Sequence, residues 1–326
     1  MKRILLNNTR EFSVAAAIVL MFVVFGSIDS IYVAPASIRS IIEQATIFGL
    51  MGIGMTGIII SGGIDLSVGS ALAFVGVIIA QLAVMGVHPI LCIILGLCLG
   101  FTLGLVNGFL VTKMRLQPFI ATMGTMSVYR GLAFVVTGGL PVLGVPSEYR
   151  GLVFGELFPY VRTSVVIFFV FAIIMYILLR HTPFGSYIYA IGGNEEASRL
   201  SGIKVQKNRM LMYALGMLGT SLAAIIHIGM LGTGAPASGT GYELNAIAAA
   251  AIGGTSMAGG KGNVIGTVLG AILFAGLRVG LIVIGIDTFY QFIATGLVIL
   301  LASYIEVAQS KISDWKRKLG VVKSHA

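Results

Sequence analysis

The chain is long, apolar and poorly charged: of its 326 residues, 57% are hydrophobic and only 10% are charged, and the mean hydropathy is +1.00. Soluble proteins carry about 25% charged residues, so this composition excludes the soluble enzyme classes and makes the bilayer the expected solvent. The net charge of +9 does not indicate nucleic-acid binding, because the basic residues stand in short loops between apolar runs. We therefore expect an all-α, polytopic membrane protein.

Ten apolar segments are separated by charges, prolines and glycine clusters. A bilayer core of about 30 Å needs about 20 helical residues, so the segments 44–61 and 244–258 are short for a full crossing and predict short or broken helices. The first segment lacks a small-residue cleavage motif and is expected to be retained as a span. The ten predicted spans are 12–32, 44–61, 67–87, 90–112, 119–137, 163–180, 210–231, 244–258, 263–284 and 288–308.

The distribution of Lys and Arg predicts the orientation. With ten spans, 16 of the 21 basic residues fall in the tails and loops on one side, and basic residues favour the cytoplasmic side. Both termini are therefore expected in the cytoplasm. The outer loop 138–162 is predicted to be a solvated cap, whereas the polar inner loop 181–209 is the only sizeable surface for a cytoplasmic partner.

The order of segments predicts one transmembrane domain over residues 1–326 with an internal duplication. A short span, a Gly-rich break and a longer span occur at 44–87 and again at 244–284. Both pairs run in the same direction, as in transporters built from parallel repeats. The corresponding halves are about 12–137 and 163–308.

The first polar break covers residues 61–70, with the sequence SGGIDLSVGS. Gly62 and Gly63 are expected to end the incoming helix, and Asp65 or Ser67 can cap the outgoing one. Non-helical backbone at membrane depth is tolerated where it is buried in protein or faces a water-filled cavity, and a carboxylate there is a functional hypothesis by default. These four residues are candidates to line a path or gate, with a plain helix cap at Asp65 as the alternative.

The second polar break covers residues 252–262, with the sequence IGGTSMAGGKG. It is not a phosphate-binding loop, because Lys261 is followed by Gly262 rather than Ser or Thr and no strand precedes it. Any ATP hydrolysis is therefore expected on another chain, and no cofactor or metal site is predicted. The path or gate candidates in this break are Gly253, Gly254, Thr255 and Ser256.

Polar residues inside the spans have competing interpretations. Asn107 stands between Gly104 and Gly108, which favours a role in helix packing, and it is also a candidate to line the path. Arg130 lies in the outer part of a predicted span, where an arginine is expected to extend to the lipid headgroups. His227 is expected to be hydrogen-bonded within the packing rather than to relay protons.

The inner loop carries the sharpest local signal, a predicted short helix from Glu195 to Leu200. Acidic residues at its start and a glycine after its end favour a short, rigid helical knob. The residues of this candidate contact are Gly193, Asn194, Glu195, Glu196, Ala197, Ser198, Arg199 and Gly202.

Five stretches together resemble the membrane permeases of bacterial sugar ABC importers, of the ribose/xylose/arabinose type. They are SGGIDLSVGS (61–70), YAIGGNEEA (189–197), LSGI (200–203), GTGYEL (239–244) and GGTSMAGGKG (253–262). The resemblance covers roughly residues 45 to 305, and ribose-type members are the most similar. Asn245 departs from the ribose-type pattern, which tends to have Asp there.

The resemblance implies a transport subunit rather than an enzyme, in the bacterial cytoplasmic membrane. It also implies a cytoplasmic ATPase that docks on the helical knob, an extracytoplasmic sugar-binding protein, and a second permease copy or a paralogue. Membrane lipid is a further expected partner of the chain. A ribose-like pentose is the favoured cargo, and autoinducer-2, rhamnose and polyols are alternatives. An ion-coupled secondary transporter or a channel is less favoured, because few carboxylates are at membrane depth and no ion-selective ring is evident.

Overall fold

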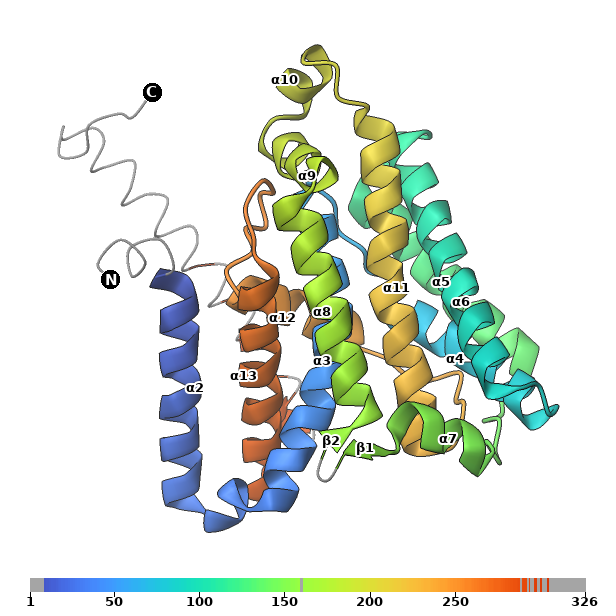
Figure 1. Cartoon of the computed structure of the whole chain (residues 1–326), viewed down its shortest axis with the longest axis vertical. Helices are drawn as coiled ribbons and strands as arrows, with labels where there is room; N and C mark the ends of the chain where they lie inside the picture. The colour runs from blue at the N-terminus through green and yellow to red at the C-terminus, as the bar shows by residue number, and fades with distance from the viewer. Residues whose placement is uncertain are drawn as a thin grey trace.

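A computed structural model describes residues 9–158 and 161–287, together with residues 289–291, 293, 296, 297, 300 and 304. This part is an all-α bundle (Figure 1). The helices are α2 (Thr9–Ile28), the 3-10 helix η1 (Ser30–Val33), α3 (Pro35–Ile60), α4 (Val68–Val84), α5 (Pro89–Thr112), α6 (Pro118–Thr137), α7 (Ser147–Phe154), α8 (Thr163–His181), α9 (Pro183–Gly193), α10 (Glu195–Leu200), α11 (Val205–Leu231), α12 (Tyr242–Ile252) and α13 (Val264–Val283).

Local sequence explains where these helices begin. Proline is the first residue of α3, α5, α6 and α9, where its missing N–H and fixed φ suit the first helical turn. Asn263 and Asn194 cap α13 and α10 by accepting a backbone N–H with the side chain. Local signals in the sequence therefore account for the starts of these six helices.

Seven of the described helices are long and apolar enough to cross a membrane, namely α2, α3, α5, α6, α8, α11 and α13, while α4 and α12 are shorter apolar helices. Within the most apolar stretch of each helix, 83% of the residues are buried in α3 and 72% in α11, whereas only 11% are buried in α2. The helices α3 and α11 therefore form the centre of the bundle. Most of the tenth predicted span, 288–308, lies outside the described residues.

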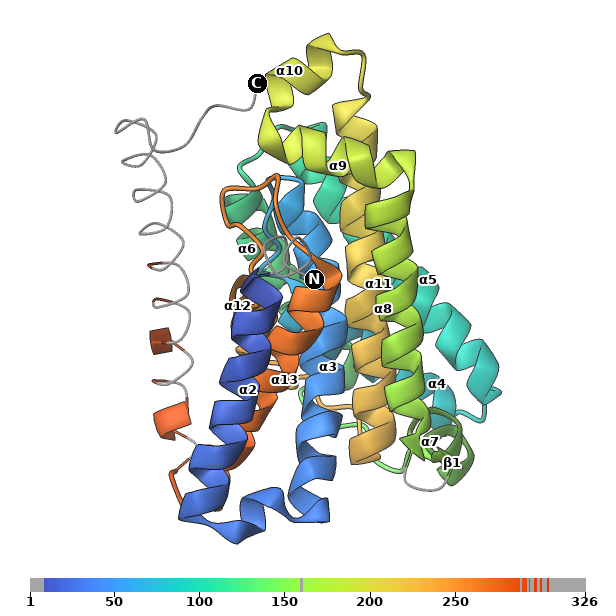
Figure 2. The same ribbon diagram turned by 60° about the vertical axis from the view of Figure 1, so that its left-hand side comes forward.

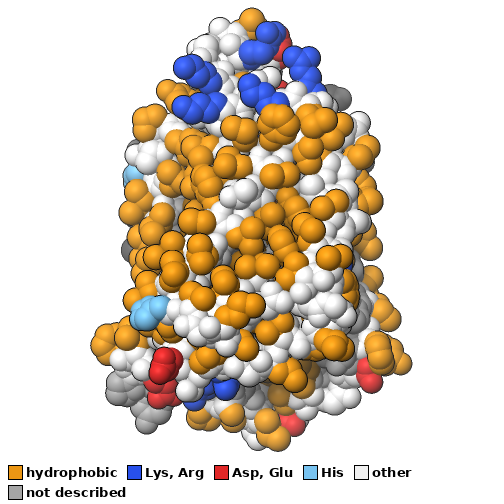
Figure 3. Space-filling model, turned by 90° about the vertical axis from the view of Figure 1, so that its right-hand side faces the viewer, with side chains coloured by type: hydrophobic (Ala, Val, Ile, Leu, Met, Phe, Trp, Pro, Cys, Tyr) orange, Lys and Arg blue, Asp and Glu red, His pale blue; other side chains and the backbone are white. Residues whose placement is uncertain are grey.

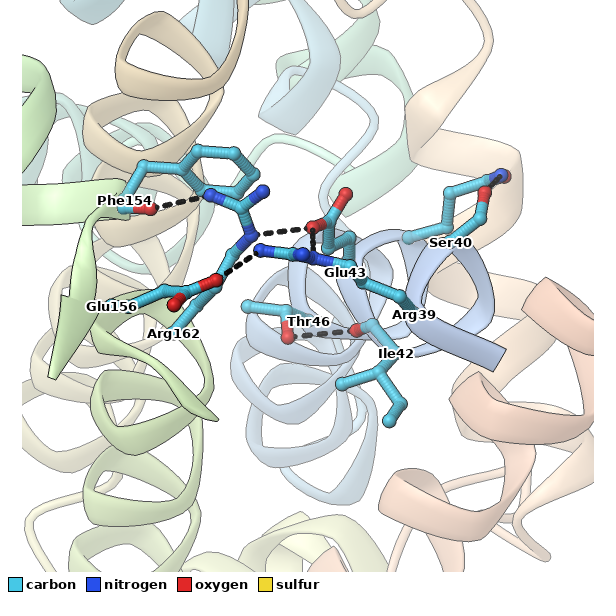
Figure 4. Close-up of polar contacts among 9 residues, drawn as sticks. Arg39, Ser40, Ile42, Glu43, Thr46, Phe154, Glu156 and Arg162 are labelled. Carbon is cyan, nitrogen blue, oxygen red and sulfur yellow. Dashed lines mark hydrogen bonds and ion pairs between the residues drawn. The ribbon is translucent and has the colours of Figure 1, made fainter. Parts of the chain in front are cut away.

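The helix α3 corrects the prediction that segment 44–61 is too short to cross. It extends over 26 residues, because Arg39 and Glu43 belong to its first turns instead of ending it. These charges lie near the start of the helix. There Arg39 contacts Glu43 and Glu156, and Glu43 contacts Arg162 at 2.6 Å (Figure 4). The short-then-long order of the predicted repeat is therefore seen in α12 and α13 and reversed in α3 and α4.

The central helices approach one another closely at small residues. A Cβ built on Gly54 of α3 would lie 2.1 Å from the Gly216 carbonyl oxygen of α11. A Cβ on Gly104 of α5 would lie 2.6 Å from the backbone of Ala214 in α11. Such backbone contacts replace the hydrophobic effect as the source of helix association in lipid.

The surface is divided into bands that match a membrane. Figure 3 shows a broad hydrophobic belt between two charged ends, with most of the visible Lys and Arg side chains at the α10 end and most of the visible Asp and Glu side chains at the opposite end. The opposite end carries α7 and the short antiparallel pair β1 (Glu156–Phe158) and β2 (Val161–Arg162), which form within the loop 138–162 that was predicted to be a solvated cap. We call the α10 end the inner end and the α7 end the outer end.

Candidate functional site

The first polar break joins the inner end of α3 to α4. The N–H groups of Ser61, Gly62 and Gly63 bond back to the last turn of α3. Gly62 has a φ of +80°, a left-handed conformation that glycine adopts at no steric cost. The chain can therefore leave α3 sharply and turn back into the bundle.

Three predicted residues and one unpredicted residue meet in a buried polar group, which we call the Asp65 cluster (Asp65, Ser67, Asn107 and Tyr129). One oxygen of Asp65 accepts the Ser67 backbone N–H at 2.9 Å and its hydroxyl at 2.7 Å. The other oxygen accepts the Asn107 amide at 2.9 Å. The Tyr129 hydroxyl lies 3.0 Å from the Asn107 carbonyl oxygen, as its donor. Asp65, Ser67 and Asn107 have no exposed surface, so each buried polar group is satisfied within the protein.

The second polar break, between α12 and α13, lies against the first. The Gly260 N–H of this break donates to the carbonyl oxygen of Ile60, the last residue of α3, at 2.9 Å. The two residues are 200 positions apart in the chain. Gly253 packs on Gly266 of α13, where a Cβ would lie 2.4 Å from the backbone. Thr255 and Ser256 are buried in this turn and do not join the Asp65 cluster.

The helices α9 and α10 lie over both breaks at the inner end (Figure 2). Gly192, at the end of α9, fits between them: a Cβ there would lie 1.7 Å from the Ile60 carbonyl oxygen and 2.6 Å from the Gly260 nitrogen. The Tyr189 hydroxyl donates to the Gly262 carbonyl oxygen at 2.8 Å. The loop and the two breaks are therefore one packed unit.

The helix α10 extends over Glu195–Leu200, as the sequence predicts. Asn194 caps it by accepting the Ala197 N–H at 2.9 Å. The exposed Glu196 is paired with Arg199, whose hydrogen bond and positive charge lower the pKa of that carboxyl. Gly202 follows with a φ of +82°. The knob thus has the capped start and the left-handed end of a rigid short helix.

Arg209 connects α10 to the first break. Its guanidinium lies 2.8 Å from the Glu195 carboxylate, and its Nε donates to the Ser61 carbonyl oxygen at 3.0 Å. The side chain therefore joins the helical knob, the start of α11 and the end of α3 (the Arg209 bridge). The sequence did not reveal this contact of Arg209, the last residue of the predicted inner loop 181–209, because its partner is a backbone carbonyl 148 residues away.

Comparison with known proteins decides the family. Residues 37–303 match the family described as "Branched-chain amino acid transport system / permease component". The chain belongs to this permease family. As a permease it is a multi-pass protein of the bacterial cytoplasmic membrane, and the family is a transport component that is not itself catalytic.

Individual relatives cover nearly the whole permease. The ribose import permease protein of Bacillus subtilis (strain 168) is 40% identical over 295 residues, 89% of this chain and 91% of that protein. The D-allose transport system permease protein of Escherichia coli (strain K12) is 32% identical over 294 residues, 90% of each chain. The galactose/methyl galactoside import permease protein of Haemophilus influenzae is 32% identical over 296 residues, 85% of this chain and 88% of that protein. No solved structure matches the chain.

Proposed function

We propose that this permease is the transmembrane subunit of a binding-protein-dependent ABC importer that carries a monosaccharide into the cytoplasm. The import permeases for ribose, allose and galactose that it resembles support a sugar as the cargo. The higher identity to the ribose permease favours a ribose-like pentose. Autoinducer-2, rhamnose or another polyol remains the alternative cargo of the same machine.

The proposed assembly contains a second permease copy or a paralogue, a cytoplasmic ATPase and an extracytoplasmic sugar-binding protein. We place both termini in the cytoplasm and count ten spans in one domain, with the parallel repeat as a continuing prediction. The concentration of Lys and Arg at the α10 end supports the orientation, because basic residues favour the cytoplasmic side (Figure 3).

The helix α10 is the proposed docking element for the ATPase. The observation that carries this role is the Arg209 bridge, since it joins an exposed knob to the break between α3 and α4. Movement of the knob would be transmitted to the two breaks through Arg209 and through Gly192. The breaks would then act as the cytoplasmic gate of the path, with Gly62, Gly63, Gly253 and Gly254 providing the turns.

Leu200 offers a direct test of docking, because this large apolar side chain at the end of α10 is 76% exposed. A photo-crosslinking residue at Leu200 is expected to capture the ATPase subunit in membranes that contain the whole importer. The same residue at Leu152 of α7, at the outer end, is the matched control and should not capture it. If Leu200 gives no ATPase adduct in any nucleotide state, α10 is not the docking element.

A further inference from the structure

A carboxylate, Glu243, and a guanidinium, Arg130, lie within the apolar part of the bundle, beside the start of α4. Tyr242, the first residue of α12, contacts Phe48 at 5.3 Å between ring centroids, and Phe48 contacts Phe274 at 5.8 Å. Phe48 and Phe274 are near the midpoints of α3 and α13, two helices long enough to span. Glu243, the next residue along, is therefore near the membrane centre.

The segment that leads to Glu243 is non-helical and runs inward along α4. A Cβ on Gly234 would lie 2.6 Å from the Ala80 side chain, and a Cβ on Gly239 would lie 2.5 Å from the Gly69 carbonyl oxygen. Gly69 and Ala80 are 11 residues apart in α4, which corresponds to a descent of roughly 17 Å along the helix. Non-helical backbone at this depth is tolerated only where it is buried in protein or lines a water-filled cavity.

Arg130 of α6 holds this segment in place instead of extending to the headgroups. Its guanidinium donates to the carbonyl oxygens of Pro236 and Ser238, each at 2.6 Å. Both contacts use the same terminal nitrogen of Arg130, and a guanidinium has five N–H groups. The remaining donors are thus held near the membrane centre.

Glu243 and Arg130 attract each other electrostatically but form none of the ion pairs found among the described residues. Both side chains are only partly buried, and Thr240 beside them is exposed. The Glu243 carboxylate is so close to the first turn of α4 that a Cβ on Gly69 would lie 2.3 Å from its oxygen. A charged pair that is partly exposed at this depth would be costly against lipid.

We propose that Arg130 and Glu243 form a contact site for sugar hydroxyl groups at the centre of the path. The inference rests on the proposed import function and assigns the cargo a place in it. A hydroxyl group donates to the carboxylate and accepts from the guanidinium, so one sugar hydroxyl can bridge the pair. A single charged pair among aliphatic neighbours binds a sugar weakly, which suits a path that must release its cargo.

Accessibility is the first test, in a variant whose Cys92 and Cys98 are replaced by Ala. Thr240→Cys in the whole importer is expected to react with a charged, water-soluble thiol reagent, and D-ribose-loaded binding protein should change the rate. Val128→Cys, on the exposed apolar face of α6, is the matched control and should stay unmodified. If Thr240→Cys is inert in every nucleotide state, the pair does not face the path, and this inference fails while sugar import stands.

Transport per ATP is the second test, using D-ribose as the probe. Glu243→Gln and Arg130→Gln should lower sugar transported per ATP roughly tenfold, the size expected for one lost hydrogen bond to a charged group, while ATP hydrolysis stimulated by loaded binding protein continues. Arg150→Gln is the control, because Arg150 also donates to a backbone carbonyl but from α7 at the outer end.

Glu243→Asp and Arg130→Lys keep the charges, so these variants should transport more sugar per ATP than the Gln variants do. An unchanged ratio in both the Gln variants would overturn the site. If the unsubstituted importer itself moves no sugar, the proposed function fails instead, so the two failures are distinguishable.

Discussion

At the residue scale, the candidate site is formed by contacts between residues that are far apart in the sequence. Local sequence patterns identified only some of the residues in it. Gly62, Asp65 and Ser67 stood out because polar and glycine residues interrupt an apolar run. Tyr129 gave no such signal, because a tyrosine in a predicted span has an apolar ring that suits the core. Its role in the Asp65 cluster depends on how α6 packs beside α5, and helix packing is not encoded in any local spacing.

Removal of the Asn107 amide should destabilise the permease, because it leaves a buried carboxylate oxygen of Asp65 without its donor at 2.9 Å. Loss of a hydrogen bond to a buried charged group costs about 2–3 kcal/mol. Asn107→Leu should therefore lower the thermal unfolding temperature of the detergent-solubilised protein. Thr102→Val on the same helix removes only a bond to the Cys98 carbonyl and should change it little. Equal effects of the two variants would contradict the role of the Asp65 cluster.

The Arg209 bridge should matter for coupling more than for folding. The Glu195 side chain is 56% exposed, so the ion pair contributes little to stability, whereas its geometry joins α10 to the Ser61 carbonyl. Glu195→Arg is expected to lower sugar uptake per ATP severalfold, at normal expression. The reversed pair Glu195→Arg with Arg209→Glu restores the attraction to α10 but not the guanidinium at Ser61.

The charge reversal thus separates two roles of Arg209. Partial recovery of uptake per ATP in the double variant, compared with either single variant, would identify the ion pair as a coupling contact. Additive losses without any recovery would show that the two charges do not act together.

At the element scale, sequence predicted helices well where their ends carry local signals. The helix α10 has the predicted bounds because an asparagine cap and a following glycine define it. The span 44–61 was predicted too short, because charges near its outer end were interpreted as a boundary. In the structure these charges pair with Glu156 and Arg162 from a segment more than 100 residues away, which allows α3 to begin at Pro35 (Figure 4).

Adjacent glycines at the end of α9 provide a matched test of the packing between loop and breaks. Gly192→Ala would place a methyl group 1.7 Å from the Ile60 carbonyl oxygen, so α9 or α3 must shift. Overpacking of this kind costs about 1–3 kcal/mol, and we expect lower thermal stability and impaired uptake. Gly193→Ala has open space around its Cβ and should be tolerated. The same thermal and uptake assays check both, and normal behaviour of Gly192→Ala would contradict the close contact.

At the scale of the whole molecule, composition alone predicted the membrane environment, and the hydrophobic belt with basic residues at one end confirms a polytopic membrane protein (Figure 3). The resemblance of five short stretches identified the permease family, which the match over residues 37–303 confirms. Composition could not predict that the two polar breaks meet beneath α9, because segments 200 residues apart are brought together only by the packing of α3, α12 and α13.

The central claim is that this permease couples ATP hydrolysis on a partner chain to sugar import. The most direct measurement is uptake of radiolabelled D-ribose, D-allose and D-galactose into proteoliposomes that contain the permease and its ATPase, with binding protein outside and ATP inside. We expect accumulation of one of these sugars that requires both ATP and the binding protein. Accumulation that instead follows a proton or sodium gradient, without ATP or binding protein, would contradict the account.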